Sequence, residues 1–277
     1  MKFLVAALFP EARPLIRRLE LKKESLGPGL ELYIGSDHAL LVTGIGRLTA
    51  AVKVARALQL PRLAGVNSVI NIGICGCSDI SIALGTVFIA NKIEEDSTTR
   101  AFFPDMLIRH PFEEATLVTV DSPKIRGPQE PPERLLYDME ASGVFQAAAE
   151  FITSDRLHFI KIVSDHLFGD KLSKDLIKDL TEDSLNIVLR FLSGLPELEP
   201  KFGLNTNEEE ALQQLREGLR LTQSQMVQVH DWAMAYRIAG GAQLTSKLIA
   251  VARAQPEKQT KSTRAVALET LRHELGL

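Results

Sequence analysis

The chain has 277 residues, and its 32 Lys and Arg against 35 Asp and Glu give a formal net charge of −3 at pH 7. This length allows one main domain of roughly 200 residues and an appendage of less than about 100. The near-neutral balance excludes a globally basic protein that holds nucleic acid through phosphate contacts, so we expect small-molecule partners and no nucleic acid.

The first ten residues are apolar and end at Pro10. A signal peptide is one interpretation, but the single Lys2 and the proline favour a buried first strand. The sequence contains no run of about 18 apolar residues, so we expect no membrane-spanning helix. Cys75 and Cys77 are too close for a normal disulfide and too few for a zinc site, which favours reduced thiols in a cytoplasmic protein.

Short apolar runs alternate with helical patterns up to about residue 193. The runs that read as buried strands are 3–8, 39–43, 68–71, 86–90, 116–120 and 159–163. The segments with helical periodicity are 47–58, 140–151 and 174–192. This alternation predicts an α/β fold with a largely parallel or mixed sheet flanked by helices, and sites beyond the carboxyl ends of its strands.

Two prolines and a lack of periodicity predict a linker at 194–206, between an α/β domain at 1–193 and a helical region at 207–277. Thr206 with Glu209, and Thr222 with Gln225, have the spacing of capping boxes. The helices expected in this region are 207–221, 223–239, 244–254 and 263–275. Its apolar stripe predicts a packing face, and the sequence assigns the region no role.

Five short motifs follow strands or open helices, where a parallel fold gathers polar groups. They are Phe9-Pro10-Glu11-Ala12, Thr43-Gly44-Ile45-Gly46-Arg47, Asn71-Ile72-Gly73-Ile74-Cys75-Gly76-Cys77, Asp138-Met139-Glu140-Ala141 and Val163-Ser164-Asp165. In this order they resemble the motifs of the purine nucleoside phosphorylase and nucleosidase superfamily. The hydrolytic members, methylthioadenosine/S-adenosylhomocysteine nucleosidase and futalosine hydrolase, are the most similar.

The resemblance implies a role for each acid. Glu11 activates a water molecule, although a shift of one residue would place Ala12 at that position. Taken alone, Glu11 fits equally an acid in the first turn of a helix, where the dipole favours it. Glu140 accepts hydrogen bonds from the ribose hydroxyls, with Met139 along the sugar face. Asp165 protonates the leaving purine. An acid at the base and anionic groups around an oxocarbenium-like sugar stabilise the transition state of N-ribosyl cleavage.

The remaining substrate-binding residues follow from the same resemblance. We expect Gly44, Ile74, Cys75 and Gly76 to form the turn and the central glycine loop of the site, and Ser164 to precede the acid that closes it. Phe103 either forms the wall for a 5′ substituent, sometimes supplied by a neighbouring subunit in this family, or packs in the core.

The reaction expected is hydrolysis of the N-ribosyl bond of a purine nucleoside or 5′-substituted adenosine. The arginine and serine that hold phosphate in the phosphorylases are absent, because Asn71 and Ile74 stand at their approximate positions. Phosphate needs charge-assisted donors, which favours water as the nucleophile. Phosphorolysis with Arg47, Lys124 or Arg126 at the phosphate, and an inactive nucleoside-binding or scaffold module, are the alternatives. The resemblance implies a homodimer, and the reaction requires no metal or cofactor.

Overall fold

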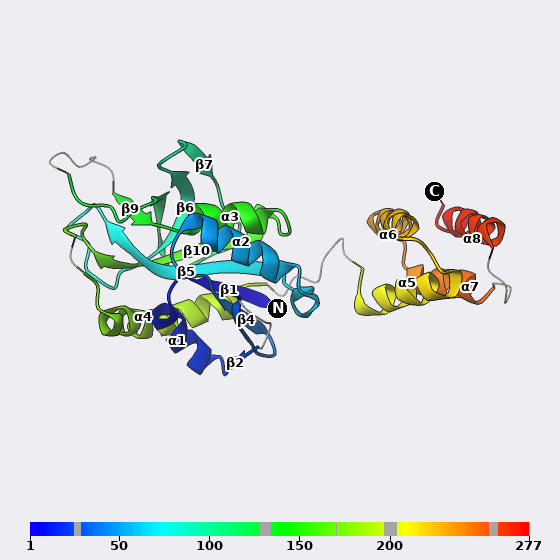
Figure 1. The fold of residues 1–277 in the computed structure, drawn as a ribbon, viewed down its shortest axis with the longest axis horizontal. Helices are drawn as coiled ribbons and strands as arrows, with labels where there is room; N and C mark the ends of the chain where they lie inside the picture. The colour runs from blue at the N-terminus through cyan, green and yellow to red at the C-terminus, as the bar shows by residue number, and fades with distance from the viewer. Residues whose placement is uncertain (25–28, 128–133, 170, 197–203, 255–259, 277) are drawn as a thin grey trace. The chain divides into compact units, whose positions relative to one another are not determined.

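The computed structural model describes residues 1–24, 29–127, 134–169, 171–196, 204–254 and 260–276. The chain forms two compact units, Met1–Pro196 and Glu197–Leu277. The first unit is a mixed sheet with helices on both faces, and the second is all-helical in its described part (Figure 1).

The strands of the first unit follow most of the apolar runs. They are β1 (Lys2–Ala6), β2 (Lys22–Lys23), β3 (Glu31–Ile34), β4 (His38–Val42), β5 (Ser68–Cys77), β6 (Val87–Glu95), β7 (Arg100–Phe102), β8 (Glu113–Thr119), β9 (Leu135–Asp138) and β10 (Leu157–Asp165). The helices are α1 (Phe9–Arg18), α2 (Arg47–Leu58), α3 (Ala141–Ala149) and α4 (Lys174–Gly194), with 3-10 turns at Pro61–Leu63 and Ser154–Arg156.

Five strands of the sheet close into a ring. β10 pairs in parallel with β5 and antiparallel with β6, and the path from β6 through β8 and β9 returns to β5. Along its other edge β5 pairs first with β1, over residues 68–71, and then with β9, over residues 76–77. The two partner strands therefore diverge around the middle of β5, and the loops that follow them lie close together there.

Two apolar cores hold the helices on opposite faces of the sheet (Figure 1). Ala50, Val54 and Ala57 place one stripe of α2 against the sheet beside α3. Leu15 of α1 and Val188 of α4 belong to the core on the other face. The expected α/β sheet flanked by helices is confirmed.

The glycine-rich motif 71–77 is not a loop, contrary to our expectation, because it continues β5 to Cys77. Its glycines provide space rather than a turn: a Cβ at Gly73 would lie 2.9 Å from Oε1 of Glu11, and one at Gly76 would lie 2.3 Å from Cδ2 of Leu167. Glu11 lies in the first turn of helix α1, which agrees with its interpretation as a helix-start acid, although Pro10 and Pro14 interrupt the helical pattern. Pro10 is tolerated in the first turn, where the missing amide hydrogen needs no partner.

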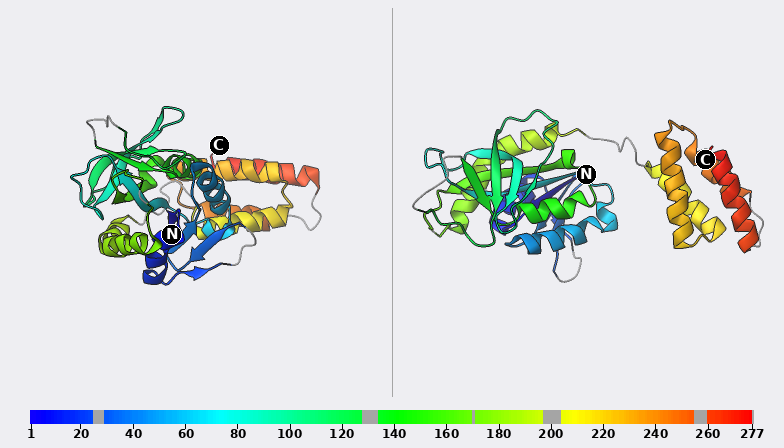
Figure 2. Two further views of the ribbon diagram at one scale, coloured as in Figure 1. Left: turned by 60° about the vertical axis from the view of Figure 1, so that its left-hand side comes forward. Right: turned by 90° about the horizontal axis from the view of Figure 1, so that it is seen from above.

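The second unit contains α5 (Thr206–Leu219), α6 (Gln223–Ile238), α7 (Leu244–Arg253) and α8 (Lys261–Glu274), coloured yellow to red in Figure 2. All four contribute to one apolar core. Val229 and Ala233, which belong to the apolar stripe predicted as a packing face, lie in this core. The cap of α6 is Thr222 with Gln225, as predicted. The cap of α5 is Asn205 with Glu208, one residue before the predicted box.

Candidate active site

Glu11 lies in the first turn of α1 with its side chain turned toward the middle of β5. Its Oε1 accepts a hydrogen bond from the amide of Ile74 at 2.9 Å, and its Oε2 accepts one from the amide of Leu8 at 2.7 Å. Ile74 falls between the stretches of β5 that pair with β1 and with β9. Burial raises the pKa of Glu11, although the amides oppose the shift. Ala12, the alternative position, faces the apolar core.

Glu140 immediately precedes α3, and its Oε1 accepts a hydrogen bond from the amide of Gly46 at 2.9 Å. Gly46 has a φ of 104°, a conformation that favours glycine. Within the expected turn, the amide that binds Glu140 is therefore that of Gly46. The amide of Gly44 donates instead to the carbonyl oxygen of Ala7. Burial and the nearby carboxylate of Asp138 raise the pKa of Glu140 to about 7.

Lys161 is a buried lysine that the sequence did not lead us to expect. Its Nζ lies 2.8 Å from Oδ2 of Asp138, and its side chain is 2% exposed. Burial favours the neutral amine, yet the carboxylates of Asp138, Glu140 and Glu11 raise the pKa of Lys161. One cation therefore stands among three acids beneath the cavity. A lysine in the middle of the otherwise apolar strand β10 is the signal that could have identified it.

Asp165 ends β10, opposite Gly76 of β5. Its Oδ1 accepts a hydrogen bond from the amide of Leu167 at 2.9 Å, and Oδ2 lies 2.8 Å from Oγ of Ser164. The Ser164 hydroxyl is also 3.1 Å from the carbonyl oxygen of Cys75. Because a Cβ at Gly76 would approach Oδ1 of Asp165 to 3.2 Å, the glycine leaves this carboxylate its space.

These acids share one cavity of about 210 Å³, which we call the acidic cavity. Its lining contains Glu11, Asp138, Glu140 and Asp165, with Ile74, Cys75, Gly76, Met139 and Ser164 between them and Ala7, Leu8, Ile45, Val120, Pro123, Lys124, Tyr137, Leu167 and Leu172 around them. Eight of the ten expected site residues thus line a single hollow.

Gly44 and Phe103 are the two expected site residues that do not line the acidic cavity. Gly44 has a φ of 80° and belongs to the turn that carries Ile45, which does line it. Phe103 is 58% exposed, so it does not pack in the core, and it does not line the acidic cavity of its own chain. Its neighbour Phe102 packs on Phe145 with ring centroids 5.2 Å apart.

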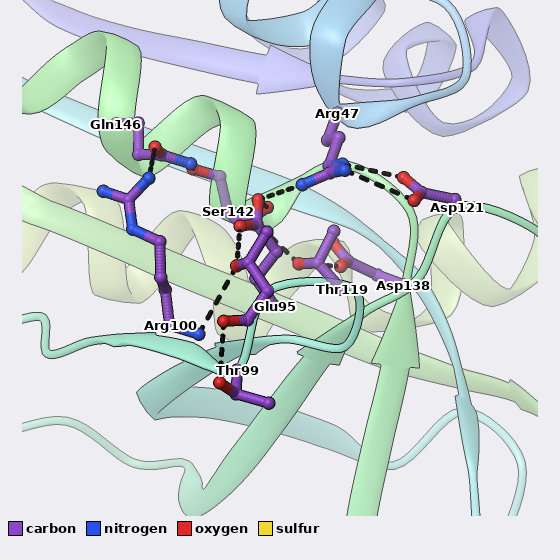
Figure 3. Close-up of polar contacts among 10 residues, drawn as sticks. Arg47, Glu95, Thr99, Arg100, Thr119, Asp121, Asp138, Ser142 and Gln146 are labelled. Carbon is purple, nitrogen blue, oxygen red and sulfur yellow. Dashed lines mark hydrogen bonds and ion pairs between the residues drawn. The ribbon is translucent and has the colours of Figure 1, made fainter.

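Arg47, the first residue of α2, bridges two acids close to the acidic cavity (Figure 3). Its Nε lies 2.7 Å from Oδ1 of Asp121, which follows β8 and precedes the lining residues Pro123 and Lys124. A second nitrogen of the guanidinium pairs with the buried Glu95 of β6. The planar guanidinium can bridge two carboxylates in this way, whereas an ammonium group presents no fixed fork.

A chain of hydrogen bonds continues from Glu95 to the cavity floor (Figure 3). Oγ of Ser142 lies 3.2 Å from Oε1 of Glu95, and the amide of Ser142 donates to Oγ1 of Thr119 at 3.0 Å. Thr119 in turn donates to Oδ1 of Asp138 at 2.8 Å. Although burial opposes its charged form, hydrogen bonds from Thr98 and Arg47 lower the pKa of Glu95. Asp138 is thus held through one oxygen by Thr119 and through the other by Lys161.

Within the described residues, no group of three or more His, Cys, Asp and Glu has the arrangement of a metal site. No described helix combines the length and apolar character needed to cross a membrane. Lys124 is the only cation among the described residues that line the acidic cavity.

Comparison with known proteins identifies similar folds. A family model of the phosphorylase superfamily matches residues 4–122. The structure resembles 5′-methylthioadenosine/S-adenosylhomocysteine nucleosidase from S. pneumoniae, solved with a transition-state inhibitor, at 21% identity and a TM-score of 0.57, covering 71% of this chain and 100% of that one. Futalosine hydrolase of Helicobacter pylori gives 12% identity and a TM-score of 0.58, covering 70% of this chain and 97% of that one.

The apo 5′-methylthioadenosine nucleosidase of Arabidopsis thaliana is similar at 19% identity and a TM-score of 0.56, covering 70% of this chain and 96% of that chain. No curated protein sequence matches the chain. The resemblance to the phosphorylase superfamily and its nucleosidases, inferred from the five motifs, is therefore confirmed. At these identities the solved structures establish the fold of the first unit.

Proposed function

We propose that the protein is a nucleosidase that hydrolyses the N-ribosyl bond of a purine nucleoside or a 5′-substituted adenosine. The observation that carries the proposal is the convergence of Glu11, Glu140 and Asp165, from separate parts of the chain, on one 210 Å³ cavity. The nucleosidase fold and the phosphorylase superfamily match support the same class of reaction.

In the proposed reaction, water attacks C1′ of the ribose while the bond from C1′ to the base nitrogen breaks. The bonding electron pair leaves with the base, Asp165 gives the base a proton, and Glu11 takes a proton from the water. A carboxylate whose pKa is raised by burial is a stronger base than an exposed one, and the raised pKa of Glu11 suits that task. The amides of Leu8 and Ile74 hold its oxygens in place.

Glu140 and Met139 would hold the sugar. A carboxylate offers two acceptor oxygens to the vicinal hydroxyls of ribose, and the Met139 thioether offers an apolar surface to the ring face. Positive charge develops on the sugar in the transition state, so the surrounding carboxylates stabilise it more than the neutral substrate. Asp138 and Lys161 would act on Glu140 by fixing its electrostatic environment.

Water is favoured over phosphate because the cavity offers few charged donors. Lys161 is paired with Asp138, and Arg47 is occupied by Glu95 and Asp121. Arg126 donates to the carbonyl oxygen of Ser78 at 2.8 Å. Lys124 is then the one cation among the described lining residues, and a phosphate dianion beside four acids would need more charge-assisted donors than this one.

Phe103 would bind the 5′ group only if a second copy of the chain supplied it. Its exposure and its absence from the lining of its own acidic cavity agree with that arrangement. The proposal therefore includes a homodimer.

The test is base release from adenosine, inosine, methylthioadenosine, S-adenosylhomocysteine and aminofutalosine, in phosphate-free and in phosphate buffer. We expect free base and free sugar from at least one substrate at equal rates in both buffers. Ribose 1-phosphate as the product would replace hydrolysis by phosphorolysis. Binding without base release over hours would identify an inactive binding module.

A further inference from the structure

Among the described residues, four buried side-chain atoms have no hydrogen-bond partner. Three of them are nitrogens of basic residues at one end of the first unit. They are Nδ1 of His110, Nε of Arg156 and Nδ1 of His158. His110 stacks on Phe112, His158 meets Phe191 edge-on, and Phe112 and Phe191 touch each other. Buried polar atoms without partners are rare in native proteins, and a bound water or ion is one explanation for them.

A second cavity, of about 360 Å³, opens at this end, and we call it the basic cavity. It lies between the segment that precedes β8 and the last turn of α4, and its lining is Ile108, Arg109, His110, Pro111, Arg190, Phe191 and Gly194. His158 is the second residue of β10, whereas Asp165 is its last, so the two cavities are roughly 20 Å apart along that strand.

Two arginines, Arg109 and Arg190, line the basic cavity. In the described part of the chain, the side chains of Arg109 and Arg190 have neither an ion pair nor a hydrogen bond. His110 is 9% exposed, and its Nε2 lies 3.5 Å from Oε1 of Glu114. Two guanidinium groups and one imidazole therefore converge on one hollow.

We propose that the basic cavity binds a phosphate group, either free phosphate or the phosphate of a monoester. Guanidinium groups match phosphate oxygens in geometry and charge, and the two arginines line the cavity beside His110. The volume exceeds that of one phosphate, which leaves room for the group that a monoester carries. This site lies apart from the acidic cavity and does not depend on the proposed hydrolase activity.

The test is calorimetric titration of the full chain at pH 7 and low ionic strength, first with inorganic phosphate and then with ribose 5-phosphate. We expect saturable binding that falls at least tenfold in affinity in Arg109→Gln and again in Arg190→Gln. Tighter binding of ribose 5-phosphate than of phosphate would identify a monoester as the ligand, and equal affinities would identify free phosphate.

Arg13→Gln is the matched control, because Arg13 is also an exposed arginine of the first unit. It should leave the affinity unchanged. His110→Gln should weaken binding, and near-ultraviolet circular dichroism should show that the variant is folded. The proposal would be overturned by an equal loss of affinity in Arg13→Gln or by unchanged affinity in the Arg109→Gln, Arg190→Gln double variant. Full competition by an equal concentration of chloride would overturn it as well.

Discussion

Replacing Glu140 by Gln should stabilise the first unit at alkaline pH while abolishing its proposed role at ribose. Glu140 is 8% exposed, and its pKa rises from 4.5 to about 7 on folding. The folded state therefore binds the proton more tightly than the unfolded state. The stability that this proton contributes is complete below about pH 4.5 and is lost as the pH rises through 7.

The magnitude follows from the size of the shift. A difference of about 2.5 pKa units corresponds to about 3 kcal/mol, because one unit is worth about 1.4 kcal/mol. Glutamine has nearly the same shape, can still accept from the amide of Gly46, and carries no charge to bury. The free energy of unfolding of the variant should exceed that of the wild type by about 2 to 3 kcal/mol at pH 8, and the two should differ little at pH 5.

Two intrinsic probes separate the units in this measurement. Cys75 and Cys77, the only cysteines, are buried in β5, so the urea dependence of thiol labelling reports unfolding of the first unit. Trp232, the only tryptophan, lies in α6, so its fluorescence reports the second unit and should be unaffected. Glu150→Gln, at the exposed end of α3, is the matched control. A gain that is the same at both pH values would refute the reasoning, as would a loss at pH 8.

Three further substitutions test individual contacts of the acidic cavity. Asp165→Asn should lower base release at least about 100-fold with the fold intact by circular dichroism, since an amide cannot supply a carboxylic proton; near-normal turnover would contradict this role. Lys161→Met leaves Asp138 buried without its cation and should lower the free energy of unfolding by about 3 to 5 kcal/mol in urea, so a cost below about 1 kcal/mol would show that the ion pair matters little. Gly73→Ala places a methyl group 2.9 Å from Oε1 of Glu11 and should reduce kcat at least tenfold while KM changes less, whereas an unchanged kcat would argue against Glu11 as the base.

Much of the fold was predictable because its signals are local. The apolar run of β10 and the stripe of α2 read correctly, since buried strands and amphipathic helices have distinct periods. β9, only four residues long, carries a weak local signal and is not predicted, and the prolines in α1 leave Glu11 as the main sign of that helix. The sequence predicts a loop over Asn71–Cys77, where the structure has a strand. A glycine that makes room for a distant side chain cannot be distinguished by sequence from a glycine that forms a turn.

The acids of the cavity were predictable from motif order, and their environment was not. Glu11, Glu140 and Asp165 each follow a strand or open a helix, where a parallel fold gathers polar groups. The pairing of Lys161 with Asp138 joins residues on two strands that are not neighbours in the sheet, and no spacing in the sequence encodes it. The contact of Arg47 with Glu95 depends in the same way on tertiary packing.

Because β5, β10, β6, β8 and β9 pair in a closed circuit, none of them has a free edge from which it can peel away. The residues that β5, β9 and β10 place around the acidic cavity are consequently protected against local fraying, and amides in these strands should exchange with solvent only in global opening. The strands of this circuit therefore form a rigid wall of the cavity. The stretch from Asp121 to Arg126 lies outside the circuit, and the hydrogen bond between Asp121 and Arg47 connects it to α2.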